Sequence, residues 1–218
     1  MLYVVGAGPG DPELMSVKAV KTLERCQVLA GWRSVLQRVI SYVPSLANKE
    51  VVYLNYAEQE ELLKRLINEA AARDVCLVAH GDPTVSDWEL LERIRGRATF
   101  EVVHSVSSLN VVLGLAGIDA AQAVVVSMHA SNPQDVTSIA KCLASERALV
   151  VYPPPYPEGP VEVARRLQSA GFGRCRAAVF ENLTMGGGLT WRGSVEELSR
   201  ASTKFSDMCI VVVDCRVE

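Results

Sequence analysis

Two short loops combine glycine, proline and aspartate, and each directly follows an apolar run. The first is Gly8-Pro9-Gly10-Asp11-Pro12 and the second is Gly81-Asp82-Pro83. Proline removes a backbone N–H donor, and each aspartate adds negative charge. The loops therefore make a poor phosphate site and would tolerate a cationic group. The alternative, that Asp11 and Asp82 only stabilise turns or cap helices, stays open at this point.

Gly6-Ala7-Gly8 also invites comparison with a dinucleotide-binding turn. The third glycine of that fingerprint is replaced by Asp11, and Ser16 is the predicted N-cap of a helix that begins too late. The second strand ends in Ala30-Gly31-Trp32, without an acidic residue for a ribose, and no Gly-Lys-Ser/Thr sequence occurs. These features disfavour NAD(P) and nucleoside triphosphates. An adenosine cofactor with a sulfonium and no phosphate, S-adenosylmethionine, suits the loops better.

The elements that position these loops alternate between short apolar strands and amphipathic helices. The strands are predicted at 2–5, 28–30, 51–54, 75–79, 100–103, 123–127, 148–152, 177–180 and 208–213, and the helices at 17–26, 58–73, 87–95, 107–115, 135–144 and 161–170. The first half reads β-α-β-β-α-β-(α)-β, which indicates an α/β fold with a mostly parallel sheet. Both loops then lie at one carboxyl edge, where such sheets bind ligands.

The second half begins a new set of elements after the segment 114–121. Its closely spaced strands around Gly186-Gly187-Gly188 predict a mixed sheet, with either a hairpin or a loop at these glycines. We therefore expect an N-terminal α/β domain at 1–115 and a C-terminal α/β domain at 116–218, with a cleft between them. Pro153-Pro154-Pro155 follows a strand and fits either a rigid connection or a wall of that cleft.

Composition narrows the function classes. The 218 residues carry a formal net charge of −3, which disfavours nonspecific nucleic-acid binding. No apolar run approaches the roughly 20 residues of a membrane helix, and no basic leader precedes the first strand, so we expect a cytoplasmic protein.

The six cysteines form no CxxC pair or Cys/His cluster, so no metal is expected. Buried free thiols are the ordinary interpretation, and an intracellular disulfide stays possible in a hyperthermophile.

Four segments together resemble the tetrapyrrole (corrin/porphyrin) methylases. Residues 5–16 resemble the opening signature of that family, and residues 81–85 resemble its second signature. His104-Ser105-Val106-Ser107-Ser108 stands where the family carries a Pro-Gly-Ile/Val-Ser/Thr-Ser/Ala turn, and Glu181-Asn182-Leu183-Thr184 resembles a late strand end. The order and spacing of these segments cover nearly the whole chain.

The resemblance implies two α/β domains in a homodimer, with S-adenosylmethionine bound between the domains and methyl transfer to an electron-rich ring carbon. The cofactor contacts it implies are Pro9, Gly81, Asp82, Val85, Ser107, Ser108, Pro153 and Leu183. Pro153 and Leu183 fit equally well as a turn proline and a core leucine. Arg33 and Arg192 are candidates for substrate carboxylates, although each also fits a solvated arginine. His129 is the candidate substrate contact or proton acceptor, although it also fits a structural histidine. His80 and Glu181 are interpreted as structural.

Within the family, the chain is most similar to the group that methylates C5 of cobalt-precorrin-7. The similarity covers residues 28–33 and 126–129, and Glu181-Asn182-Leu183 followed by Arg192-Gly193. The chain departs from that group at 128–131 and 185–189, where a basic residue is replaced in each case. Another corrin carbon, diphthine synthesis and a non-catalytic partner role stay open as alternatives. A separate C15-methylating decarboxylase is the expected partner in the pathway.

Overall fold

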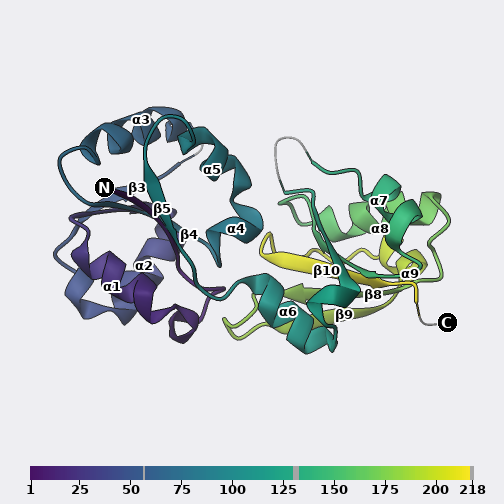
Figure 1. Ribbon diagram of the computed structural model, residues 1–218. Coiled ribbons are helices and arrows are strands. Elements are labelled where there is room, and N and C mark those ends of the chain that lie inside the picture. Colours follow the sequence, from purple (N-terminus) through teal and green to yellow (C-terminus); the bar gives the residue numbers. More distant parts are fainter. Residues whose placement is uncertain (56, 130–132, 217–218) are drawn as a thin grey trace. The chain divides into compact units, whose positions relative to one another are not determined.

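The computed structural model describes residues 1–55, 57–129 and 133–216. The chain divides into two compact units, Met1–Ser108 and Leu109–Glu218 (Figure 1). The division lies between Ser108 and Leu109, whereas the sequence interpretation places it after residue 115. Among the described residues, none of the helices is both long and apolar enough to cross a bilayer.

The first unit is built on a five-stranded parallel sheet with the order β3-β2-β4-β1-β5. Its strands are β1 (Leu2–Gly6), β2 (Val28–Gly31), β3 (Glu50–Tyr53), β4 (Val75–Ala79) and β5 (Phe100–Val103). Its helices are α1 (Val17–Arg25), α2 (Arg33–Tyr42), α3 (Gln59–Glu69), α4 (Pro83–Ser86) and α5 (Trp88–Ile94), with 3-10 turns at Pro12–Leu14 and Pro44–Leu46.

Strand alternation explains why this sheet is covered on both faces. Successive side chains of a strand point to opposite faces. Tyr3 and Val5 of β1 pack into one apolar cluster with α1 and α2. Leu2 and Val4 pack into a second cluster with α3 and α5. Figure 1 shows the two helix layers on either side of the strands. Continuous apolar strands of this kind are typical of parallel sheets buried on both faces.

The second unit has a five-stranded mixed sheet with the order β6-β7-β10-β8-β9. Its strands are β6 (Ala123–Ser127), β7 (Ala148–Tyr152), β8 (Arg176–Glu181), β9 (Gly188–Ser194) and β10 (Cys209–Asp214). Its helices are α6 (Ser108–Ala116), which begins on the last residue of the first unit, α7 (Val136–Leu143), α8 (Gly159–Ser169) and α9 (Val195–Ser199), with a 3-10 turn at Ala120–Gln122. Of the hairpin and the loop expected as alternatives, the hairpin is confirmed, because β8 and β9 pair antiparallel.

The sequence interpretation missed three helices, α2, α4 and α9, and it gave no bounds for β9, the second strand of the hairpin. It passed directly from the second strand to the third, but the segment 33–42 is helical. Val35, Leu36 and Val39 supply a buried helical stripe, yet Trp32 at the N-cap makes no side-chain capping bond. The usual start signal was therefore missing. The segment α9 is only five residues long, although Ser194 and Glu197 form a capping box at its start.

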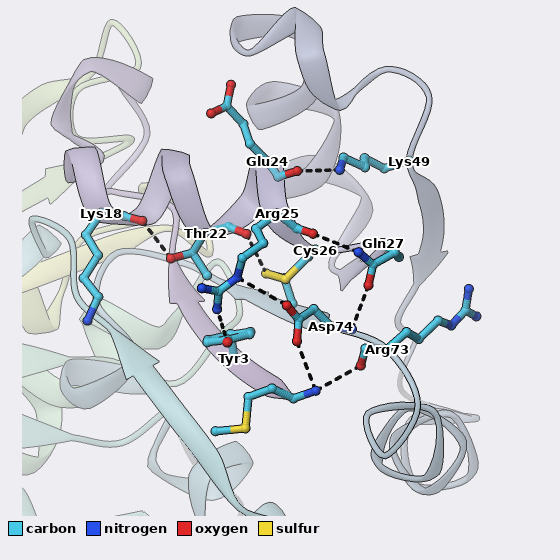
Figure 2. The surroundings of a disulfide bond; sticks show 12 residues. Tyr3, Lys18, Thr22, Glu24, Arg25, Cys26, Gln27, Lys49, Arg73 and Asp74 are labelled. Atoms are coloured by element: carbon cyan, nitrogen blue, oxygen red, sulfur yellow. Dashed lines mark hydrogen bonds and ion pairs between the residues drawn. A yellow bond between two sulfur atoms is a disulfide. The ribbon is translucent and has the colours of Figure 1, made fainter.

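Two disulfides correct the expectation of free thiols. Cys26, which follows α1, bonds to Cys76 of β4 (Figure 2), and Cys175 bonds to Cys215 beyond β10. Figure 2 also shows Arg25 directed at Tyr3 and Asp74 beside the first disulfide. Arg25 donates to the Tyr3 hydroxyl and lies 3.2 Å from the Asp74 carboxylate. Sequence spacing failed here because the partners are 50 and 40 residues apart and meet only through the folded sheets.

Candidate functional site

The two Gly-Pro-Asp loops lie side by side at the carboxyl edge of the first sheet, as predicted. Gly8 and Gly81 form an antiparallel bridge in which Gly81 N–H donates to the Gly8 carbonyl at 2.9 Å, and Gly8 N–H donates to the Gly81 carbonyl at 3.2 Å. Gly81 has a φ of +57°, the left-handed region that favours glycine. A Cβ on Gly6 would lie 2.5 Å from the Gly81 carbonyl oxygen. Only glycine therefore permits this approach of the two loops.

Asp82 acts as the N-cap of α4 and also ties that helix to the segment after β5. Its Oδ1 accepts from the Thr84 amide at 2.9 Å and from the Thr84 hydroxyl at 2.6 Å. Its Oδ2 lies 2.9 Å from His104 Nδ1 and accepts from the Ser105 amide at 3.1 Å. Burial acts to raise the pKa of this carboxyl, but the bonds from Thr84, His104 and Ser105 together hold the pKa below its usual value. Asp82 therefore stays ionised at neutral pH.

Asp11 caps the 3-10 turn at Pro12–Leu14, where its side chain accepts from the Glu13 amide at 2.9 Å. In their local contacts, both Asp11 and Asp82 therefore cap the start of a helical turn, as the alternative interpretation predicts. This interpretation does not oppose an anionic rim, because accepting hydrogen bonds does not remove the charge of a carboxylate. The role of Asp82 beside a cationic cofactor stays a prediction.

The first unit brings six of the predicted cofactor residues to one edge of its sheet. Pro9 is buried next to the Gly8–Gly81 bridge, and Val85 is half-buried in α4. A Cβ on Gly81 would lie 3.5 Å from the Ser107 Cα and 3.6 Å from the Ser108 nitrogen. Ser107 is 2% exposed. The second loop therefore lies close to the start of α6, with room for little more than a methyl group between them.

Arg33, the predicted substrate contact of this unit, is the first residue of α2. Its guanidinium lies over the Tyr53 ring, 4.1 Å from the centroid. Arg33 lies just beyond β2, and Tyr53 is the last residue of β3. These neighbouring strands are parallel, so both residues lie at the same carboxyl edge as the two loops. A cation–π contact of this kind holds the arginine while its N–H groups stay open to an anion.

In the second unit, three predicted residues share one sheet edge. Strands β6 and β7 are parallel, and β10 is antiparallel to both β7 and β8, so β6, β7 and β8 run in one direction. His129, Pro153 and Leu183 follow these strands in that order. His129 is exposed, whereas Pro153 and Leu183 are buried. Arg192 is exposed within β9 opposite Ala178, so it is not brought to this edge. The departure at 130–131 lies outside the described residues.

Sequence reasoning missed two titratable groups near the second loop. His104 was noted only as part of a family segment, although it contacts Asp82 directly. Asp87, between α4 and α5, has a buried Oδ2 without a hydrogen-bond partner, and burial raises its pKa to about 7. His104 could have been chosen as a candidate site residue from its position, because a histidine stands where the family has proline. No sequence signal marks Asp87 as buried.

The chain has two α/β units, and the first of them carries a pair of loops at the carboxyl edge of its parallel sheet. The two loops are bridged through glycines and have few N–H donors. Residues 1–199 match the model of the tetrapyrrole (corrin/porphyrin) methylases. The chain therefore belongs to this family, whose members are S-adenosylmethionine-dependent methyltransferases.

Relatives and solved structures agree with that assignment. The chain is 30% identical over 118 residues to a uroporphyrinogen-III C-methyltransferase of Methanobacterium ivanovii, covering 50% of each chain, so it spans about half the length of this curated relative. It is 26% identical to a uroporphyrin-III C-methyl transferase from Thermus thermophilus in complex with S-adenyl homocysteine, with a TM-score of 0.74 over 100% of this chain and 93% of that one. A precorrin-6Y methylase from Archaeoglobus fulgidus shares the fold at 23% identity, with a TM-score of 0.72 over 98% and 97%.

Proposed function

We propose that this chain is an S-adenosylmethionine-dependent C-methyltransferase that acts at C5 of cobalt-precorrin-7 in cobalamin synthesis. The observation that carries the cofactor assignment is the Gly8–Gly81 bridge between two loops that are poor in N–H donors and rich in carboxylate. The likeness to a structure holding S-adenyl homocysteine supports it. The C5 assignment is supported by the sequence segments at 28–33, 126–129 and 181–183, and by the fold of the precorrin-6Y methylase.

The predicted residues divide between cofactor and substrate in this proposal, with Asp82 beside the sulfonium and His129 in contact with the substrate. Pro9, Gly81 and Val85 border the methionine part of the cofactor, and the N–H and hydroxyl groups of Ser107 and Ser108 receive its carboxylate. Pro153 and Leu183 contact the adenosine. The sulfonium is already a good leaving group, so the protein mainly positions the methyl group against the ring carbon. Arg33 and Arg192 pair with substrate carboxylates.

Calorimetric titration tests the cofactor assignment. We expect S-adenosylmethionine to bind, and ATP, which has the same adenosine but carries phosphates, to bind at least tenfold more weakly. The ATP comparison isolates the charge argument, because both ligands offer the same adenosine to the protein. An absence of heat with S-adenosylmethionine, or tighter binding of ATP, would refute the assignment.

A methyl-acceptor assay tests the substrate. Purified cobalt-precorrin-7 is incubated with S-adenosylmethionine carrying a ¹³C-methyl group, and the product is located by NMR. We expect the label at C5. Label at another carbon would overturn the C5 assignment and leave the methyltransferase assignment intact.

Uroporphyrinogen III is the second candidate substrate. The specific observation that favours it is the 26% identity, over 100% of this chain, to a uroporphyrin-III C-methyl transferase. The same labelled assay with uroporphyrinogen III in place of cobalt-precorrin-7 separates the two. Transfer to uroporphyrinogen III at the higher kcat/KM would replace the C5 proposal.

The proposal extends to a cytoplasmic homodimer that works with a separate C15-methylating decarboxylase. Sedimentation velocity on the purified chain tests the dimer. A species of one chain at micromolar concentration would remove that part of the proposal.

A further inference from the structure

His104 directly follows β5 and stands where the family turn has proline. Its Nδ1 lies 2.9 Å from Asp82 Oδ2, and the His104 side chain is 65% exposed, whereas that of Asp82 is 8% exposed. A buried carboxylate thus holds one nitrogen of an exposed imidazole. A proline at the same position could not make this contact, because it has no side-chain nitrogen.

The state of Asp82 sets the tautomer of the ring. Asp82 remains a carboxylate at neutral pH because hydrogen bonds from Thr84, His104 and Ser105 lower its pKa against the effect of burial. A carboxylate only accepts hydrogen bonds, so Nδ1 of His104 carries the proton. Nε2 then holds the lone pair, and an imidazolium formed at Nε2 would be stabilised by the same carboxylate.

The backbone that carries the ring is fixed from both loops. Ser105 donates from Oγ to the Gly6 carbonyl at 2.7 Å and accepts from the Ser16 amide at 3.1 Å. Ser16 Oγ in turn donates to the His104 carbonyl at 2.5 Å. His104 is therefore held against the same Gly6–Gly8 segment that bridges to Gly81. A functional group needs this kind of support to keep its geometry.

Other charged groups near the loop are less suited to receive a proton. Glu101 of β5 is paired with Lys18 of α1 at 2.6 Å. Asp87 has a buried Oδ2, so a substrate could not reach that oxygen without rearrangement. Asp82 already accepts four hydrogen bonds. His104 combines a free lone pair with exposure at the sheet edge that holds the predicted cofactor loops.

We propose that Asp82 and His104 form a dyad in which His104 Nε2 accepts the proton that the macrocycle loses after methyl transfer. This inference rests on the proposed function. An electron pair of the ring forms the new C–CH3 bond, and the breaking S–CH3 bond leaves its pair on sulfur, which gives neutral S-adenosylhomocysteine. The methylated substrate then carries one more positive charge than before. Loss of one proton to Nε2 restores its original charge, and the imidazolium later releases that proton to water.

Two substitutions test the dyad in the full chain. His104→Asn keeps an N–H that can reach Asp82 but removes Nε2, and His104→Pro restores the residue of the family turn. We expect both to bind S-adenosylmethionine within twofold of the unmodified chain. Both should lower kcat about 10²-fold or more, which is the usual contribution of general acid–base catalysis. The acid limb of the pH–rate profile should disappear in both variants, and added imidazole should restore part of the rate to His104→Asn.

The pattern of kinetic changes decides between roles. A raised KM with unchanged kcat would show that His104 binds a substrate carboxylate and would overturn the proposal. Unchanged kcat with an unchanged pH profile would overturn it too. If the unmodified chain methylates no tetrapyrrole, the proposed function fails, which is a separate outcome.

A second measurement is independent of activity. The ¹⁵N shifts of the three histidine rings in the ligand-free chain report which nitrogen carries the proton. We expect the neutral His104 ring to have Nδ1 protonated and Nε2 unprotonated, and Asp82→Asn to abolish this preference. An Nε2–H tautomer in the unmodified chain would refute the dyad.

Discussion

The carboxyl edge of the first sheet and the turn after β8 in the second unit reach unusual backbone geometry by different means. In the first unit, the left-handed positions are glycines, with φ of +74° at Gly8 and +57° at Gly81. In the second, they are Asn182 with φ of +47° and Thr184 with φ of +63°. Thr184 is β-branched, and such residues are genuine outliers in this region.

Hydrogen bonds hold the turn of the second unit in place. Asn182 donates to the Met208 carbonyl at 3.0 Å, and Ser206 Oγ donates to Asn182 Oδ1 at 3.1 Å. Glu181 accepts from the Ser206 amide. The left-handed backbone at the first sheet edge is therefore possible because glycine occupies it. The left-handed backbone of the turn after β8 is instead imposed by the hydrogen bonds around it. Strain imposed in this way is commonly found at functional positions, and here it flanks Leu183, a predicted cofactor contact.

Removing the disulfides should have the largest effect on stability, and each unit has one disulfide, so the two units can be compared. Replacing Cys26 and Cys76 by alanine removes a link across 50 residues, and replacing Cys175 and Cys215 removes one across 40. The loss of chain entropy predicts about 4 kcal/mol of stability for each pair. Urea unfolding of the two double variants measures it. A loss below about 1 kcal/mol in either unit would show that the fold does not depend on that link.

Gly81→Ala tests whether the first edge truly depends on glycine. The left-handed φ should cost about 1 to 2 kcal/mol of stability, and the binding of S-adenosylmethionine should weaken about tenfold because the loop shifts. Gly96→Ala is the matched control, since Gly96 has a φ of +79° in the same unit and no atom lies within 4 Å of its Cβ position. It should lose similar stability and keep its affinity. Equal loss of affinity in both variants would refute a local role for Gly81.

Two carboxyls of the first unit should respond to pH in opposite directions. The folded-state pKa of Asp82 is lowered, so its stabilisation is present above the unfolded pKa of about 4 and is lost as the pH falls through the folded value. The pKa of Asp87 is raised to about 7, so its favourable effect is present below about pH 4 and is lost as the pH rises toward 7.

Unfolding free energies of Asp82→Asn and Asp87→Asn at pH 3, 5 and 8 check both signs. Asp82→Asn should be less stable than the unmodified chain at pH 8, with a smaller difference at pH 3. Asp87→Asn should be more stable than the unmodified chain at pH 8, and the two should be similar at pH 3. Parallel pH dependence of the two variants would contradict the assigned environments.

Thr184→Gly should give the smallest effect. Glycine relieves the left-handed strain, while its greater freedom in the unfolded chain offsets part of the gain. We expect a gain of up to about 1 kcal/mol, measured by urea unfolding. Asn182→Gly should gain less, because asparagine tolerates this region better. A loss above 1 kcal/mol in Thr184→Gly would show that the Thr184 side chain outweighs the strain.

Much of the fold follows from local pattern, because apolar runs and helical stripes report burial directly. The strand at 75–79 and the hairpin that β8 forms with β9 are predicted from the sequence and confirmed. The helix at 33–42 was missed because its N-cap carries no capping side chain. The disulfides and the contact between Asp82 and His104 depend on segments brought together by the sheet, and no local signal encodes them.

The antiparallel bridge between Gly8 and Gly81 also has a consequence for motion. Loops rich in glycine and proline are ordinarily expected to fluctuate, but here both bridging amides are hydrogen-bonded across the loops. Their hydrogen exchange should therefore be as slow as that of the adjoining strands. The edge of the first sheet would then meet a ligand already ordered, so that little conformational entropy is lost when the ligand binds.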